Sequence, residues 1–487
     1  MTRRARAWWI VAGLWGVAAG MTGCGAERTA ARRGRTILYA SGADFETVNP
    51  LITVLPLAKQ VERYLLLTTL ARYDTALVPQ PYLARAWRFS PDGTVLTFTL
   101  RTGLRWDDGL LTTARDVAWT LNAARDPATG YPRLNDLAGI VSVNDPNDST
   151  VVIRYGSPVK HFPDVLTDLA ILPAHLFDTL PHERMRSAGW NERPVGNGPF
   201  RFVLHQSNRR WVFQAKPDFP ADLGGPAHLD RFIVVVVDQP STKLAALTSG
   251  ELDFAGIFPA HASYVRKDPN LAVISYPLLF TYGLVFNTRR PPFDRRQVRL
   301  AAALALDRRE IVDGYLYGFA TPADGPVPPD LPGYLPVPPL PLAPDSARRL
   351  LGGRRVPFEL LTVGSGEAAL EQMIQARLDA VGFDVRIRQL ELSAFLDRVQ
   401  GPLHDFDAAV MGVQGDFGLG YLSPLLALTG MRGPTDPARL QKLFRDSLPV
   451  AFLYHGRGLA GMNARVRGVR MDVRGELASV IDWRVGP

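Results

Sequence analysis

Strand-like and helix-like segments alternate along most of this chain, and that alternation limits the folds it can adopt. In "PSTKLAALTSGELDF", an apolar helix is expected to begin at a cap on Ser241 and to stop at Gly250, and a strand follows. From Val356 the order is a strand, a helix over residues 367–381 and a second strand, "FDVRIRQL", which together make a βαβ unit. Elements that alternate in this way pack in layers, so the sequence predicts an α/β fold.

Local signals define several further elements. "WRFSPDGTVLTFTL" has turn residues between two β-rich runs and predicts a hairpin. Thr113 followed by Asp116 is close to a capping box and predicts the start of a helix. The proline-rich residues 321–344 can form neither a helix nor an inner strand, so we expect an ordered extended loop, with a disordered linker as the alternative.

Chain length and composition indicate a globular protein of two or three domains. Single hydrophobic cores stop growing at about 250–300 residues, and this chain has 487 residues, 46% of them apolar and 21% charged. Its one cysteine cannot form an internal disulfide, so the core alone must stabilise the fold. The net charge of +8 is modest, and the basic residues are scattered rather than gathered with aromatic ones. We therefore expect no nucleic-acid partner.

Residues 1–23 have the features of a signal peptide. Three arginines precede an apolar run over residues 7–21, which is shorter than the roughly 20 residues that span a bilayer. The next step, "MTGC", resembles the bacterial lipobox, in which a peptidase cuts before a cysteine whose sulfur carries a diacylglycerol. We predict lipidation of Cys24, with residues 24–35 as a tether. A nearby signal-peptidase site with an incidental Cys24, and a twin-arginine signal, are the alternatives.

Four segments together resemble one protein family. They are "TVNPL", "SPDGTVLTFTLRTGLRWDDGLLTTARDVAWTL", "PVGNGPFRF" and "GLVFNTRRPPFDRRQVRLAAALALDRREIV", and the resemblance spans roughly residues 36–413. The family is the bacterial extracellular solute-binding proteins of family 5, which serve peptide and nickel ABC importers. Each segment alone is weak evidence, whereas the set in the family's order is specific.

The resemblance implies a two-lobed clamshell of the periplasmic binding protein type II kind, within the α/β class and with an extra inserted domain. Lobe I would contain residues 36–53, 192–271 and 454–487, the inserted domain residues 54–191, and lobe II residues 272–453. Such a clamshell closes over its ligand by a hinge motion. The stretch after "SPLLALTG" is shorter than in the family, so part of lobe II looks deleted.

The resemblance also implies a function outside the cytoplasm. The chain would be the substrate-binding component of an ABC importer, a lipid-anchored monomer without a cofactor that passes peptides or peptide-like solutes to permease subunits. A nickel-chelate or oligosaccharide receptor on the same fold, a secreted lipoprotein hydrolase and a peptide-holding chaperone are the alternatives. The sequence contains no G-x-S-x-G, H-E-x-x-H or P-loop motif, which disfavours the hydrolase.

A ligand-binding carboxylate can be carried over from the family. Its members hold the α-ammonium of the ligand with an acidic residue that ends a G-W-x-x-D stretch in lobe II. The matching stretch here ends at Gly415 and Asp416, and Val413 stands where relatives have Trp. An Asp–ammonium contact is a charge-assisted hydrogen bond. The alternative is that Asp416 only forms a turn among glycines.

Three further residues complete the predicted site. Thr53 and Val54 match a place where relatives offer backbone groups to an extended ligand. Tyr282, on the expected hinge strand, would face the cleft; its alternative is an ordinary aromatic residue of a strand.

Overall fold

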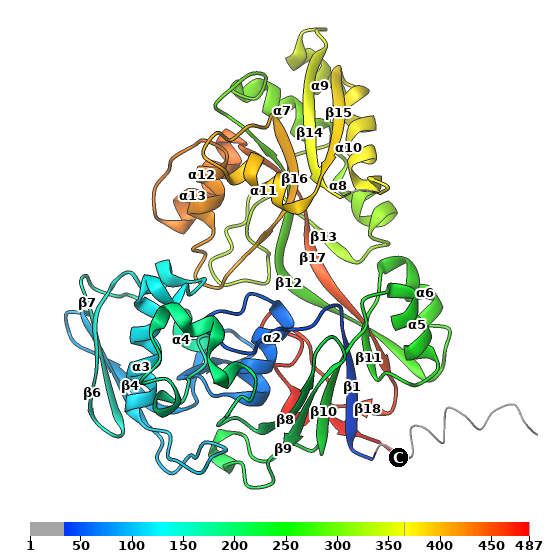
Figure 1. Cartoon of the computed structure of the whole chain (residues 1–487). Helices are drawn as coiled ribbons and strands as arrows, with labels where there is room; N and C mark the ends of the chain where they lie inside the picture. Colours follow the sequence, from blue (N-terminus) through cyan, green and yellow to red (C-terminus); the bar gives the residue numbers. More distant parts are fainter. Residues whose placement is uncertain (1–33, 365, 487) are drawn as a thin grey trace, which may run out of the picture.

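The computed structural model describes residues 34–364 and 366–486, which form two lobes joined by two long strands (Figure 1). The joining strands are β12 (Leu271–Phe286) and β17 (Val450–Asn463), which pair antiparallel. Both belong to an 11-stranded sheet with the order β15-β14-β16-β12-β17-β11-β1-β10-β9-β8, and β13 pairs with β17. This is the two-lobed α/β architecture that the sequence predicted.

Lobe I lies at the lower right of Figure 1 and holds one half of this sheet. Its central strand β1 runs parallel to β10 and β11, and β10 pairs antiparallel with β9. Short helices α5 (Pro240–Thr248) and α6 (Ala262–Val265) lie beside it. The strands are β1 (Thr36–Ser41), β8 (Phe200–Gln206), β9 (Arg210–Ala215), β10 (Arg231–Val236) and β11 (Phe254–Gly256).

A separate four-stranded antiparallel sheet lies beside lobe I, in the order β4-β5-β7-β6. One hydrophobic cluster runs through lobe I and this sheet, from Trp211 and Phe232 to Phe98 and Val151. A large shared core opposes relative motion of the two parts. The elements of this region are α2 (Pro56–Val61), the π-helical turn η1 (Glu62–Leu66), β2 (Ala71–Tyr73), β3 (Pro79–Pro81), β4 (Ala84–Phe89), β5 (Val95–Leu100), α3 (Ala114–Arg125), β6 (Ile140–Asn147), β7 (Thr150–Tyr155) and α4 (Val165–Asp168).

Lobe II, at the top of Figure 1, carries helices on both faces of its half of the sheet. Successive strand residues point to opposite faces, so Phe286 belongs to one hydrophobic cluster and Val285 to a second one on the other face. The elements are α7 (Arg296–Ala305), α8 (Arg308–Glu310), the π-helical turn η9 (Ile311–Tyr315), β13 (Ala320–Pro322), α9 (Pro344–Leu351), β14 (Val356–Val363), α10 (Ala369–Asp379), β15 (Phe383–Leu390), α11 (Leu392–Gln400), β16 (Ala408–Gln414), α12 (Leu422–Leu428) and α13 (Pro437–Ser447).

Most of the local predictions are confirmed. β4 and β5 form the hairpin, Thr113 and Asp116 form a capping box at the start of α3, and β14 and β15 are parallel strands joined by α10. The proline-rich segment is ordered, because β13 pairs with β17 and both Val327 and Leu331 are buried. The cap on Ser241 was wrong. Helix α5 begins at Pro240, a residue favoured in the first helical turn, and its N-cap is Gln239, two residues before Ser241.

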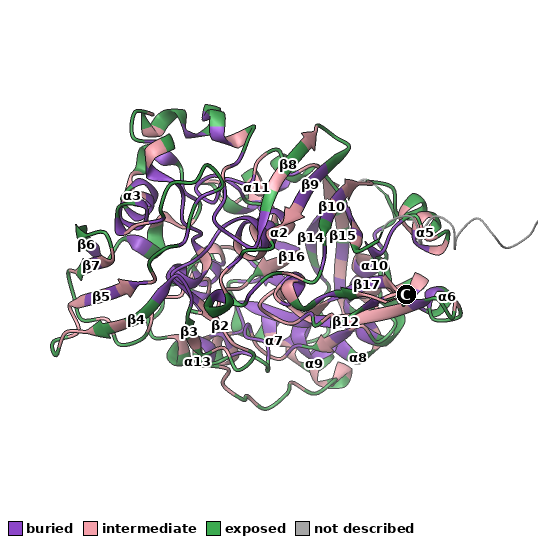
Figure 2. Cartoon of the chain, turned by 90° about the horizontal axis from the view of Figure 1, so that it is seen from below, coloured by how far each residue is buried: buried purple, intermediate pink, exposed green. Residues whose placement is uncertain are grey.

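Buried residues concentrate along the central strands, whereas exposed ones lie on loops and outer helix faces (Figure 2). Among residues 34–364 and 366–486, no helix is both long and apolar enough to cross a bilayer. The predicted signal peptide and Cys24 lie outside the described residues.

Candidate functional site

A cleft of about 1780 Å³ lies between the two lobes, where the paired strands β12 and β17 pass from one lobe to the other. Small-molecule sites usually enclose about 300–1000 Å³, so this cleft has room for a ligand of several residues. Both sides contribute its lining: Val54, Lys59, Arg63, Tyr73, Arg133, Asp164, Asp168 and Phe258 from the lobe I side, and Tyr315, Tyr317, Phe319, Met373, Asp416 and Tyr421 from lobe II.

The crossing strands lose their regular pairing at the base of the cleft. Pro277 pairs with Arg457 and Thr281 with His455, so residues 278–280 stand opposite Gly456 alone. Three residues opposite one make a bulge, which interrupts the ladder and bends the strand. The bulge lies just before Tyr282, on the strand that the sequence analysis expected to be the hinge strand.

Asp416 lies on the lobe II wall, two residues after the end of β16. Its Oδ1 accepts the backbone N–H of Gly420 at 2.9 Å, and its Oδ2 accepts that of Tyr421 at 3.0 Å. The carboxylate therefore shapes the turn before α12. A carboxylate has about four lone-pair sites, so two remain for a ligand. In the described part of the chain, no cationic side chain forms an ion pair with Asp416.

Three other predicted residues also line the cleft. Val54 is exposed, and Tyr282 stacks on Tyr454 with ring centroids 4.7 Å apart. Gly415 donates its N–H to the carbonyl of Leu279 at 2.7 Å, which ties the Asp416 turn to the bulge.

Two predicted residues are not part of the lining. Thr53 is buried, and its N–H donates to the carbonyl of Asn49 at 3.0 Å. Val413 packs against a hydrophobic cluster of lobe II, while its neighbour Gln414 lines the cleft. Successive residues of β16 point to opposite faces, so Val413 faces away from the ligand space. Its position lends no support to the prediction that Val413 belongs to the ligand-binding site.

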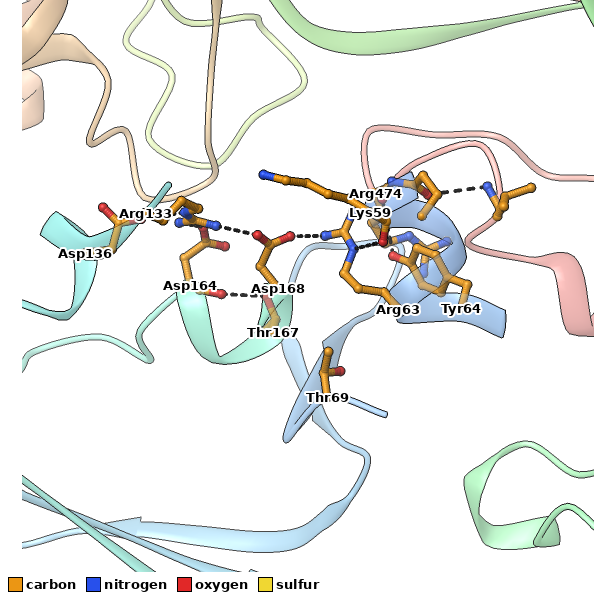
Figure 3. A network of polar contacts seen from close by, with 12 residues as sticks. Lys59, Arg63, Tyr64, Thr69, Arg133, Asp136, Asp164, Thr167, Asp168 and Arg474 are labelled. Atoms are coloured by element: carbon orange, nitrogen blue, oxygen red, sulfur yellow. Dashed lines mark hydrogen bonds and ion pairs between the residues drawn. The ribbon is translucent and has the colours of Figure 1, made fainter. Parts of the chain in front are cut away.

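The sequence analysis missed a network of charged residues on the lobe I side of the cleft (Figure 3). Arg63 of η1 forms an ion pair with Asp168 at the end of α4. Arg133 binds Asp168 and Asp164 at 2.9 Å each and Asp136 at 2.6 Å. Burial alone would raise the pKa of Asp168, but the two arginines outweigh it and hold that pKa well below its usual range. Asp168 therefore stays ionised and fixes both arginines.

Lys59 differs from the other cationic residues of the lining. Its side chain has neither an ion pair nor a hydrogen bond within the described part of the chain, and Figure 3 draws it free of the network. Lys59 and Arg63 are one helical turn apart, so they share a face. That spacing, just after "TVNPL", is the signal that could have found them in the sequence.

Comparison with known families identifies the chain. The model of the bacterial extracellular solute-binding proteins, family 5 (middle), matches residues 78–431. A putative ABC transporter peptide-binding protein of Brucella ovis is 32% identical over 243 residues. That match covers 50% of this chain and 45% of the relative, so it spans about half of each protein. A probable di/tripeptide-binding protein of Pseudomonas aeruginosa is 28% identical over 403 residues, 75% of each chain.

Solved structures share the fold. The oligopeptide-binding protein AppA from Bacillus subtilis, in complex with a nonapeptide, has a TM-score of 0.78 at 20% identity over 93% of this chain and 99% of its own. A putative peptide-binding protein from Clostridium difficile has a TM-score of 0.82 at 19% identity, over 93% and 100% of the two chains. With the family model matching well over half of its length, this chain belongs to the bacterial extracellular solute-binding proteins of family 5.

Proposed function

We propose that the chain is the substrate-binding component of an ABC importer, which captures a peptide or peptide-like solute in the cleft and presents it to permease subunits. The family places it outside the cytoplasmic membrane. The names of its relatives and the nonapeptide complex of the Bacillus subtilis protein support a peptide as the ligand.

One observation carries this proposal: two opposite charges that form no ion pair among the described residues line the cleft from its two sides. Asp416 is on lobe II, and Lys59 is on α2 beside lobe I. A free peptide has an ammonium at one end and a carboxylate at the other. Asp416 binds the ammonium and Lys59 the carboxylate, each by a charge-assisted hydrogen bond. The ligand is thus held at both ends by side chains that form no ion pair within the described part of the chain.

Because these two contacts come from opposite walls, the same ligand favours closure. A ligand shifts a conformational equilibrium only by its difference in affinity for the two states. A peptide that touches one lobe in the open form and both in the closed form has that difference. We propose that residues 36–53, 192–271 and 454–487 move with the inserted residues 54–191 as one unit, and residues 272–453 as the other. The shared core supports the first unit.

The ligand leaves the cleft unchanged in this proposal. The protein binds without turnover, as a monomer held to the membrane through lipid on Cys24. Among the described residues, no cluster of three or more His, Cys, Asp or Glu side chains is arranged to hold a metal ion.

Native mass spectrometry of the purified protein with di- to pentapeptides tests the function. We expect one peptide per chain, recovered intact after incubation, and weaker binding when the amino end is acetylated or the carboxyl end amidated. Lys59→Met should abolish the preference for a free carboxyl end, while the exposed Lys160→Met, outside the cleft, should keep it. Hydrolysis of the peptide, or equal binding whatever the state of both ends, contradicts the proposal.

A further inference from the structure

The cleft has a second wall of a different character, formed by residues 314–319, "GYLYGF". The side chains of Tyr315 and Tyr317 line the cleft and are 38% and 58% exposed. Phe258 lines the same cleft from lobe I with 57% exposure. Aromatic side chains bury a large apolar area when they are covered, so three exposed rings in one cleft offer such an area to a bound ligand.

The backbone of this wall is held in an unfavourable conformation. Tyr317 has a φ of 53°, a left-handed conformation that is an outlier for a bulky residue. The turn is fixed on both sides, because Gly318 donates its N–H to the carbonyl of Val312 at 2.9 Å and Phe319 donates to that of Leu316 at 2.8 Å. Strained residues of this kind cluster at ligand-binding positions, where the strain presents a side chain. The strained backbone therefore holds the exposed ring of Tyr317 in the cleft.

The aromatic wall and Asp416 lie on opposite faces of the lobe II sheet. Leu316 and Tyr282 pack against the cluster on one face, and Phe417 and Tyr421 pack against the cluster on the other. A ligand whose ammonium binds Asp416 therefore has to extend from one face of the lobe II sheet to the other to reach Tyr317. The residue that meets the aromatic wall is not the first residue of the ligand.

Both lobes contribute to this end of the cleft. Phe258 and Pro259 come from the lobe I side. The guanidinium of Arg266, just after α6, lies 5.1 Å from the ring centre of Phe319 on lobe II. Residues of both lobes therefore meet at the Phe319 end of the cleft, and a side chain bound there lies next to both lobes.

We propose that this end of the cleft is a specificity subsite for an aromatic or large aliphatic side chain of the bound peptide, at a position after the first residue. The proposal rests on the peptide-binding function above. The occupant belongs to the ligand because these rings line the same cleft as Asp416 and Lys59. Closure would bury the side chain between rings of both lobes, so the subsite also favours the closed form.

Isothermal titration with tetra-alanine and its single-phenylalanine variants tests the subsite. We expect Phe at one position after the first to bind about tenfold to a hundredfold tighter than Ala, which is the effect of burying one such side chain. Phe at the first position should give no such gain. Tetra-alanine that binds without any gain from Phe overturns the subsite alone, whereas no binding of any peptide overturns the peptide-binding function itself.

Two variants locate the effect. Tyr317→Gly removes the ring and suits the positive φ, so we expect the gain from Phe to fall at least severalfold while the melting temperature holds or rises. Phe258→Ala should also reduce the gain. Tyr264→Ala is the matched control, because Tyr264 is 57% exposed on α6 but does not line the cleft. An unchanged gain in both Tyr317→Gly and Phe258→Ala, or a loss of stability in Tyr317→Gly, overturns the proposal.

Discussion

Replacing Asp416 by Asn should weaken binding of peptides with a free amino end by at least about thirtyfold. The carboxylate accepts hydrogen bonds from the N–H groups of Gly420 and Tyr421, and it has no cationic partner within the described residues. Its charge is therefore available to the ligand. Removing one member of an enclosed, hydrogen-bonded charge pair costs about 2–5 kcal/mol, and the lower value corresponds to roughly thirtyfold in Kd.

The substitution also has a structural cost that can be separated from recognition. An Asn side chain has one acceptor oxygen, so one of the two backbone N–H groups loses its partner, at a cost of about 1 kcal/mol in stability. Any effect of that lost hydrogen bond on the cleft lowers the affinity for all ligands alike. A peptide acetylated at its amino end should bind the wild type weakly and lose little further affinity in Asp416→Asn.

Titration calorimetry with both peptides on wild type and variant gives the four affinities of this cycle. Asp145→Asn, at an exposed position of β6 away from the cleft, is the matched control and should bind as the wild type does. Equal affinity of wild type and Asp416→Asn for the free-amino peptide would refute the reasoning, and Asp416 would then be a turn former only.

Three more predictions concern stability and location. Glu62 is 2% exposed, its Oε1 has no hydrogen-bond partner within the described residues, and burial raises its pKa well above the usual value. The folded protein thus keeps a proton that the unfolded chain releases above about pH 4.3, so stability falls as pH rises from there toward the folded pKa, by up to about 1.4 kcal/mol per unit. Urea unfolding should show a flatter pH profile for Glu62→Gln than for the wild type, and parallel profiles would contradict this. Thr113→Ala removes half of the capping box of α3 and should lower the free energy of unfolding by about 1 kcal/mol, measured by calorimetry. Thr113→Ser is the control and should be near wild type. Equal melting temperatures of the wild type and both variants would count against the cap. Cys24→Ala should move the protein from the membrane to the soluble envelope or culture fraction, and a lipidated variant in the membrane fraction would show that the anchor is elsewhere.

Elements whose signals act over a few residues could be predicted from the sequence. The turn between β4 and β5 and the capping box at Thr113 each depend on side chains within five positions of one another. The wrong cap at Ser241 also has a local cause. Pro240 takes the first helical position, so the cap is Gln239.

The candidate site was only partly predictable, because its contacts join distant segments. Asp416 could be placed through the resemblance to the family, but Arg63 and Asp168 are 105 positions apart and no periodicity links them. Val413 was expected at the ligand-binding site, but the register of β16, which the sequence does not reveal, decides which residues face the cleft. The conformation of Tyr317 depends on the turn that holds it, which "YLYGF" does not reveal.

Small-angle scattering with and without a bound peptide tests most directly the claim that one ligand bridges the two lobes. The measurement needs a peptide whose saturation has been shown by calorimetry on the same sample. The account predicts a smaller radius of gyration when the cleft is filled, as lobe II turns about residues 278–280 toward lobe I. An unchanged radius of gyration at demonstrated saturation would contradict it.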